Sequence, residues 1–132
     1  MPEYMLDTNI CIYIMAGRAA VLSDQFQRRA NAVCISTITF AELWYGVENS
    51  NRREANAATL TEFSSRLEVL QFSARAAAHY GQIRTQLRRA GTPVGFHDMM
   101  IAAHARSEGL TLVTNNRREF DRISGLRVEN WV

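Results

Sequence analysis

The sequence predicts an α/β fold in which helices cover both faces of a central, mainly parallel sheet. Short apolar runs typical of strands recur along the chain, and segments with the period of amphipathic helices separate them. Strands that alternate with helices form parallel sheets covered on both faces. The length of 132 residues, 47% of them hydrophobic, suits one domain over residues 1–132. We therefore expect a three-layer α/β/α sandwich.

Five strands are expected, each a short run with β-branched or aliphatic residues. They cover residues 3–6 (EYML), 32–36 (AVCIS), 68–72 (EVLQF), 110–114 (LTLVT) and 127–130 (RVEN). Helices are expected between and before them, at residues 9–15, 19–29, 37–49, 54–66, 73–90, 97–108 and 116–122. Gly91, followed by Pro93, ends one helix, and Gly109 ends another, as is usual at helix C-termini. In such sheets ligands bind at the carboxyl ends of the strands, so functional residues are expected there.

The basic residues are all arginine, fifteen in number, and the chain has no lysine. This excludes P-loop nucleotide binding, Schiff-base chemistry and phosphatase sites in which an aspartate works with a lysine. Arginine suits forked contacts to phosphate and stacking on bases, although a GC-rich genome explains the composition equally well. Apart from four acids discussed below, fifteen positive residues stand against nine negative ones. An acidic pocket on a basic surface suits a polyanionic substrate.

The cysteines and the apolar runs indicate a cellular compartment. Cys11 and Cys34 both lie in apolar segments, the pattern of buried, reduced thiols in a cytosolic protein. No apolar run approaches the roughly 20 residues of a membrane span, and the N-terminus lacks the features of a signal peptide. We expect a complete, soluble, cytoplasmic chain with no membrane partner.

Four acids are expected at one edge of the sheet. Asp7 follows the first strand, Glu42 lies one turn into the helix after the second strand, and Glu119 follows the fourth. Asp98 opens the helix 97–108. Asp7, Asp98 and Glu119 are therefore expected at strand-to-helix junctions, and Glu42 is expected within one helical turn of such a junction. Clustered carboxylates repel one another and raise their own pKa values unless a cation joins them. Because the ligands are hard oxygens, Mg²⁺ or Mn²⁺ is favoured over zinc.

Each acid also has an ordinary structural explanation. Asp7 in DTN can cap the helix that follows, and Thr39-x-x-Glu42 has the spacing of a capping box. Asp98 in a first turn is favoured by the helix dipole. Glu119 on its own would be an unremarkable surface residue.

Two neighbours of these acids are weaker candidates. Asp121 competes with Glu119 for the role of fourth acid, but the local helical phase exposes it more. His97 adjoins the predicted site, and its place at the start of a helix is enough to explain it. The three histidines, His79, His97 and His104, form no ligand motif.

Several motifs in one order resemble a known family. The segments LDTN, STITFAELWYG, DMMIAAHARSEGLTLVTNNRREF and GLRVENW extend from Met5 to Trp131. They resemble the PIN-domain ribonucleases, specifically VapC-type toxins of toxin–antitoxin pairs. The resemblance implies an α/β/α sandwich, magnesium-dependent cleavage of structured RNA, inhibition by a small VapB-like antitoxin, and a homodimer that forms higher assemblies with that antitoxin.

The resemblance also assigns roles to the acids. Asp7 and Asp98 match the direct metal ligands, and Glu42 and Glu119 match outer acids that hold metal-bound water. The chain departs from the family at Asn116, where many members have aspartate, and in the Glu119-Phe120 pair, where many use aspartate. The identity of the fourth acid and the presence of a second metal therefore stay open.

Further residues near the predicted pocket have supporting roles or ordinary ones. Hydrogen-bonding side chains that could orient the carboxylates, or serve only as turns and caps, are Thr8, Asn9, Thr114, Asn115 and Asn116. Arginines that flank the fourth acid and are expected to contact RNA phosphates are Arg117, Arg118 and Arg122. A solvated helix face better explains Arg84, Arg88 and Arg89.

The expected chemistry is hydrolysis by metal-activated water, with a metal on Asp7 and Asp98 and with Glu42 or Glu119 positioning the water. The products would be a 5′-phosphate and a 3′-hydroxyl, from a transfer RNA loop by family analogy. Trp44 and Tyr45 could stack bases, although core packing or antitoxin contact better suits Trp44. The resemblance implies an antitoxin groove between helices early in the chain, often with an antitoxin arginine reaching the acids. The alternative is a non-catalytic PIN-fold module that binds RNA or protein, which the retained acids disfavour.

Overall fold

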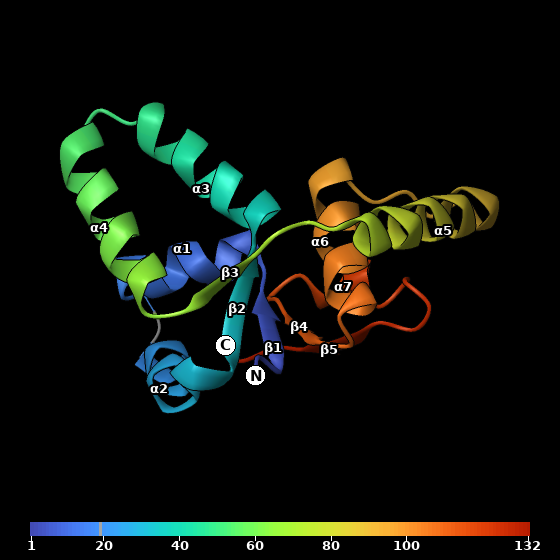
Figure 1. Ribbon diagram of the computed structural model, residues 1–132, viewed down its shortest axis with the longest axis horizontal. Helices are drawn as coiled ribbons and strands as arrows, with labels where there is room; N and C mark the ends of the chain where they lie inside the picture. The colour runs from blue at the N-terminus through green and yellow to red at the C-terminus, as the bar shows by residue number, and fades with distance from the viewer. Residues whose placement is uncertain (19) are drawn as a thin grey trace.

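The computed structural model describes residues 1–18 and 20–132 and contains a five-stranded parallel sheet at its centre (Figure 1). The strands are β1 (Tyr4–Leu6), β2 (Val33–Ser36), β3 (Glu68–Leu70), β4 (Thr111–Val113) and β5 (Arg127–Glu129). Their order across the sheet is β3-β2-β1-β4-β5, and every neighbouring pair is parallel. In register, Met5 of β1 lies between Cys34 of β2 and Leu112 of β4.

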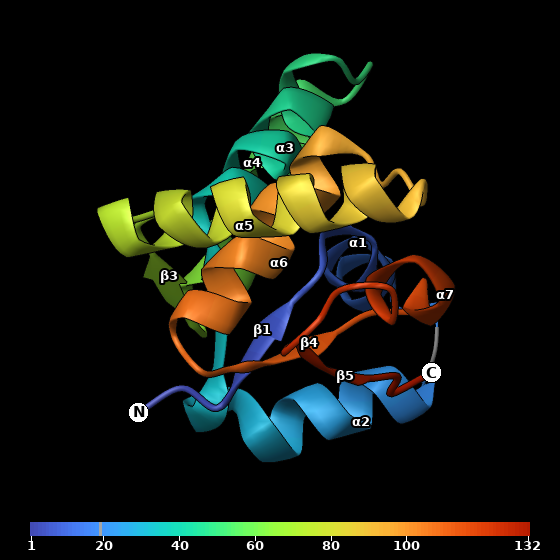
Figure 2. The same cartoon turned by 90° about the vertical axis from the view of Figure 1, so that its right-hand side faces the viewer.

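Helices connect the strands and form the two outer layers. They are α1 (Thr8–Ala16), α2 (Ala20–Arg29), the 3₁₀ turn η1 (Ala30–Ala32), α3 (Thr37–Glu48), α4 (Arg53–Ser65), α5 (Ala74–Ala90), α6 (Phe96–Ser107) and α7 (Arg117–Phe120). Figure 1 shows α1 to α4 on one side of the sheet and α5 to α7 on the other, and in Figure 2 α5 and α6 lie in front of the sheet. In the described part of the chain, none of these helices is both long and apolar enough to cross a membrane.

Two hydrophobic cores, one on each face, hold the three layers together. Because successive strand residues point to opposite faces, Met5 packs in the core under α5 and α6, while Leu6 packs in the core under α1 to α4. Leu112 and Val113 divide between the two cores in the same way. The predicted α/β/α sandwich is confirmed, and Cys11 and Cys34 are buried and free, as expected.

Each predicted strand and helix is present, with ends that coincide or differ by one or two residues. Residue 19, where one helix was expected to begin, lies outside the described residues. The third strand stops at Leu70 and not at residue 72, because the Phe72 N–H donates to the Thr37 hydroxyl (3.1 Å) and leaves the sheet. The helix expected over 116–122 is the single turn α7, and Asn116 precedes it without a side-chain cap.

The strand order places a crevice where a ligand can bind. The chain leaves β1 toward β2 on one side, and it later returns to β4 on the other side. In open parallel sheets, ligands bind beyond the carboxyl ends of the strands at such a reversal. Asp7 follows β1 and Thr114 follows β4 directly, so both lie at this position.

Candidate functional site

Asp7 is the buried centre of the candidate site. It follows β1, its side chain is almost inaccessible (3% exposed), and it caps α1. Its Oδ1 accepts the Thr8 N–H (2.7 Å), and its Oδ2 accepts the hydroxyl of Thr114 (2.8 Å). Burial raises the pKa of Asp7, the two hydrogen bonds act against that rise, and the charge of Glu42 adds to it. The expected capping role is therefore real, but it uses only one of the two carboxylate oxygens.

Glu42 reaches the site because α3 begins directly at the end of β2. Ser36 is the N-cap of α3: its hydroxyl accepts the Ile38 N–H (3.0 Å). The capping box that the Thr39-x-x-Glu42 spacing suggested is wrong, because the helix begins one turn earlier and Thr39 is buried inside it. Glu42 is thus free to turn toward α1 and α6.

Two contacts hold the Glu42 carboxylate. Its Oε1 accepts the Thr8 hydroxyl (2.7 Å), and its Oε2 lies 2.9 Å from Nδ1 of His97. The side chain of Glu42 is 26% exposed, so it faces the solvent side of the site while Asp7 forms the floor. His97, explained from the sequence by its place at a helix start, therefore also contacts an acid of the site.

Asp98 lies in the first turn of α6 and is repelled by all three other acids. Burial is the main cause that raises the pKa of Asp98 to about 6, and the charges of Asp7, Glu119 and Glu42 add to this rise. Only the charge of His97 lowers it. The charges of the three other acids therefore act on Asp98, although all four are far apart in sequence. One expectation was wrong: Asp98 is not at a strand-to-helix junction, because the loop 91–95 joins α6 to α5.

Glu119 lies in the short helix α7 and is half-buried, between exposed Arg118 and buried Phe120. Phe120 beside it is fully buried and anchors the turn in the core. Asp121 is exposed and pairs with Arg117 (3.2 Å between Oδ2 and Nε). The structure therefore places Glu119, and not Asp121, close enough to raise the pKa of Asp98.

The expected supporting residues divide into two groups. Thr8 and Thr114 contact the acids directly, and Asn116 donates its backbone N–H to the Thr114 hydroxyl (2.9 Å). Asn9 is exposed on α1, and Asn115 is half-buried. No hydrogen bond from the side chain of either asparagine to an acid is found in the described structure, so the threonines orient the carboxylates.

The arginines expected at the substrate surface also differ from one another. Arg118 is exposed, and Arg117 is exposed but paired with Asp121. Arg122 is half-buried and donates from Nη1 to the backbone carbonyl of Pro93 (3.0 Å), so it holds a loop. On α5, Arg84, Arg88 and Arg89 are all exposed, as expected for a solvated face.

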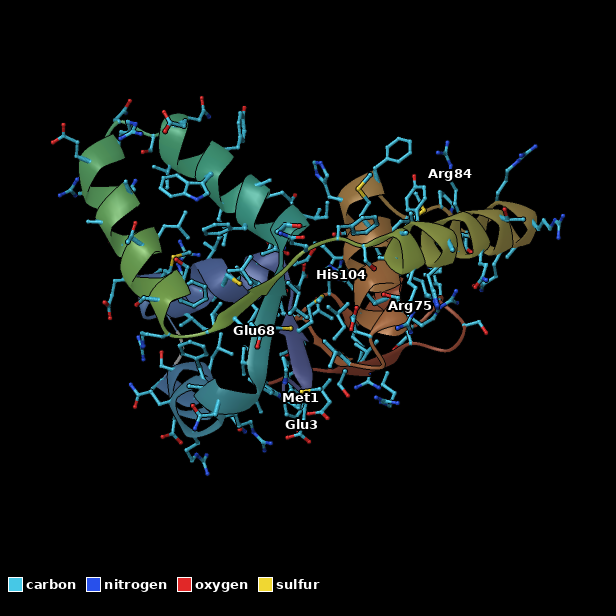
Figure 3. All side chains as sticks on the ribbon, in the orientation of Figure 1. Met1, Glu3, Glu68, Arg75, Arg84 and His104 are labelled. Carbon is cyan, nitrogen blue, oxygen red and sulfur yellow. The ribbon has the colours of Figure 1, made fainter. Side chains whose placement is uncertain are left out.

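One contact that sequence analysis missed joins the two helices carrying Glu42 and Asp98. Nδ1 of buried His104 on α6 lies 2.8 Å from the Ser36 hydroxyl at the start of α3. Figure 3 labels His104, which lies between α6 and the strands. Because the residues are 68 positions apart, no local pattern could have predicted this contact.

The donor set suits a hard divalent cation bound through few protein ligands. Within residues 1–18 and 20–132, no three Asp, Glu, His or Cys side chains converge closely enough to enclose a metal ion. Mg²⁺ usually uses one or two carboxylates and keeps several waters, so it needs no such enclosure. The pKa of Asp98 is raised first by burial and then by the charges of the other acids, and a cation between Asp7 and Asp98 would offset both effects.

An apolar groove begins beside Glu42 and extends between α1, α3 and α4. Its volume is about 420 Å³. Mainly aliphatic side chains and one glycine line it: Ile12, Met15, Leu43, Gly46, Val47 and Leu60. Trp44 is half-buried and packs edge-to-face on Phe40, and Tyr45 is 71% exposed. The groove is open to an extended or helical peptide.

The chain matches known proteins over nearly its whole length. The family model described as "PIN domain" matches residues 4–126. The chain is 50% identical to "tRNA(fMet)-specific endonuclease VapC" of Shigella flexneri, over 99% of both chains, and 49% identical to "Ribonuclease VapC2" of Haemophilus influenzae, over 100% of both. Its fold is similar to a chain of the DNA-bound VapBC crystal structure from Salmonella typhimurium (TM-score 0.96, 50% identity, 100% of both chains). A chain of promoter-bound VapBC2 from Rickettsia felis gives a TM-score of 0.93 at 44% identity, over 98% of both chains.

Proposed function

Because the chain belongs to the PIN-domain family and, within it, to the VapC ribonucleases, we propose that it is a magnesium-dependent endoribonuclease and the toxin of a toxin–antitoxin pair. The observation that carries this proposal is the group of four facing carboxylates, with the pKa of Asp98 raised to about 6. Repulsion between carboxylates lowers the stability of the folded protein, and a catalytic metal site would explain why they nevertheless lie together.

In the proposed site, Asp7 and Asp98 hold Mg²⁺, for which Mn²⁺ can substitute. The chemistry that a bound ion would supply is neutralisation of the scissile phosphate and activation of water near neutral pH. Thr114 and the Thr8 N–H orient the Asp7 carboxylate and act against the rise of its pKa. Glu42, held by Thr8 and His97, and Glu119 would accept hydrogen bonds from the attacking water. The products carry a 5′-phosphate and a 3′-hydroxyl.

We propose transfer RNA as the substrate and a loop of it as the cleaved segment. The Shigella flexneri relative, 50% identical, is named for tRNA(fMet). A loop presents unstacked bases that side chains can read, which a duplex does not. Cleavage of transfer RNA also implies that the protein acts in the cytoplasm.

The groove beside Glu42 is the proposed seat of a VapB-like antitoxin. Chains of this fold are found in VapBC complexes from Salmonella typhimurium and Rickettsia felis. An apolar peptide segment would fill the space between α1, α3 and α4, and an arginine at its end would reach Glu42 and the acids behind it. The antitoxin would then inhibit cleavage because its positively charged arginine occupies the negatively charged site. We propose a homodimer as the toxin's own assembly.

The proposed activity is tested by incubating the purified protein with total transfer RNA, with Mg²⁺ or with EDTA, beside Asp7→Asn. We expect fragments with 5′-phosphate ends only from the unmodified protein in Mg²⁺. Equal fragments in all three reactions would indicate a contaminating nuclease. Cleavage that resists EDTA, or 2′,3′-cyclic phosphate ends, would contradict the proposed chemistry.

A further inference from the structure

A second hollow lies near Asp98, at the first turn of α6. It has a volume of about 550 Å³ and lies between the end of α5 and the start of α6. We call it the Phe96 notch; its principal lining residues are Arg84, Arg88, Pro93, Val94, Phe96 and Met99. Of the described residues that line it, none is acidic.

An exposed aromatic ring and a guanidinium group lie against each other in the notch. Phe96 is 55% exposed, although its ring is large and apolar. The Arg84 guanidinium carbon lies 4.8 Å from the centre of that ring, within the range of a cation–π contact. Arg88 follows Arg84 by one helical turn, so both cations share a face of α5. In Figure 3 the side chain of Arg84 rises from α5 away from the sheet.

The loop that closes the notch is fixed. Thr92 donates its N–H to the Leu87 carbonyl (3.0 Å), and Arg122 donates to the Pro93 carbonyl (3.0 Å). Gly91 turns the chain with φ of 68°, a left-handed conformation that few side chains allow. A ligand would therefore meet a formed surface, with little ordering cost for the loop.

The notch and the acidic site share a wall. Phe96 is two residues before Asp98, and a Cβ placed on Gly95 would lie 4.0 Å from Oδ2 of Asp98. A nucleic-acid strand whose scissile phosphate lies at Asp98 would bring an adjacent nucleotide over Gly95 into the notch.

We propose that the Phe96 notch binds the nucleotide next to the scissile phosphate, with its base stacked on Phe96 and its phosphate paired with Arg84 and Arg88. This inference rests on the proposed ribonuclease function. Charge favours RNA over a second copy of the chain, because two notches facing each other would oppose their arginines. It also changes the expected phosphate contacts, because Arg122 is engaged with the Pro93 carbonyl. Arg84 and Arg88 are exposed, and Arg84 makes a long hydrogen bond from Nη1 to the Tyr80 hydroxyl (3.3 Å) that a phosphate would have to replace.

The test measures binding of an unmodified initiator transfer RNA transcript in an Asp7→Asn background, where cleavage does not interfere. In that background we add Phe96→Leu, Phe96→Tyr, Arg84→Gln or Arg88→Gln. The control is Arg89→Gln, which removes an equally exposed arginine of α5 that does not line the notch. Melting temperature and molecular mass in solution are recorded for every variant.

We expect Phe96→Leu to raise the Kd about tenfold, in the range of base–aromatic stacking, and Phe96→Tyr to restore it. Each of Arg84→Gln and Arg88→Gln should lower the slope of log Kd against log salt concentration by about 1, because one phosphate contact is lost. A role in folding alone would not change that slope. Arg89→Gln should leave Kd and slope near the parent values.

Three results would overturn the proposal. If the parent binds the transcript but the notch variants match Arg89→Gln, the nuclease function stands and the notch is not its subsite. If Phe96→Leu converts a dimer to a monomer, the notch is an interface between copies. If the parent does not bind the transcript at all, the proposed function itself fails.

Discussion

At the scale of single residues, hydrogen bonds favour the charged form of Asp7, whereas burial disfavours it. Asp7 is almost fully buried, and burial alone favours its protonated form. The Thr114 hydroxyl offsets this by donating to Oδ2, while it accepts the Asn116 N–H. One buried hydroxyl therefore links the end of β4 to the carboxylate at the end of β1.

Thr114→Val removes that hydroxyl with little change of shape. The pKa of Asp7 should rise further, because a hydrogen bond to its charged form is lost. We expect the Mg²⁺ concentration for half-maximal cleavage to increase about tenfold and the free energy of unfolding to fall by about 1–2 kcal/mol. The control is Thr85→Val on the exposed face of α5. An unchanged Mg²⁺ requirement would show that Asp7 does not depend on Thr114.

Asp98→Asn should stabilise the metal-free protein at alkaline pH while it abolishes cleavage. The pKa of Asp98 is raised from 3.8 to about 6, so the folded state binds a proton more tightly than the unfolded chain. The stability this gives is complete below about pH 4 and lost as pH rises through 6. Denaturant unfolding in EDTA should show a gain of about 1–2 kcal/mol at pH 8, after discount for partial exposure, and little at pH 4.

Asp24→Asn, in an exposed ion pair with Arg28 on α2, is the matched control and should show no such gain. Equal stability of Asp98→Asn and the unmodified protein at pH 8 would mean that the carboxylates do not repel one another as described.

At the scale of elements, α3 serves two purposes. Its first turns carry Glu42 into the acidic site, and its middle forms a wall of the apolar groove with Gly46. A Cβ placed on Gly46 would meet no atom within 4 Å, and Gly46 lines the groove, so the position has room for the start of a side chain. The groove can therefore be filled without disturbing the helix.

Gly46→Leu should separate antitoxin binding from catalysis. The leucine would occupy the groove and raise by at least tenfold the antitoxin concentration that half-inhibits transfer RNA cleavage. Cleavage without antitoxin should stay within about twofold of normal, since leucine also favours the helix. Gly81→Leu, at an equally open glycine of α5, is the control. Unchanged inhibition of Gly46→Leu would place the antitoxin elsewhere.

Elements were predictable where local chemistry fixes them. The strands were found because β-branched and aliphatic runs suit a buried parallel sheet, and Gly91 ended α5 as expected because it is left-handed there. The capping box at Thr39 was wrong because Ser36, directly after the strand, caps α3 first. The position of Asp98 relative to the strands was also misjudged, because a loop from α5, and not a strand, leads into α6.

At the scale of the molecule, the strand order decides which residues meet. The sequence predicts that strands are parallel but not that β1 lies between β2 and β4. That order brings Thr114 to Asp7, 107 residues away, and the packing of α3 against α6 brings His97 to Glu42. Contacts at such separations leave no trace in one sequence, whereas the acids themselves do, through their positions after strands and at helix starts.

The pH dependence of the whole reaction should follow the acid cluster. Protons compete with Mg²⁺ for Asp98, whose pKa is about 6 without metal. At low Mg²⁺ the cleavage rate should therefore fall as pH decreases through 6, and high Mg²⁺ should move the midpoint lower. Rates at two Mg²⁺ concentrations between pH 5 and 8 test this. A pH midpoint that is the same at both Mg²⁺ concentrations would indicate that the titrating group does not bind the metal.

The central claim, that Asp7 and Asp98 together hold the divalent ion, is tested most directly by anomalous diffraction from crystals soaked in Mn²⁺. We predict one strong peak within bonding distance of both carboxylates, absent from Asp98→Asn crystals. A peak elsewhere, or the same peak in Asp98→Asn, would contradict the claim.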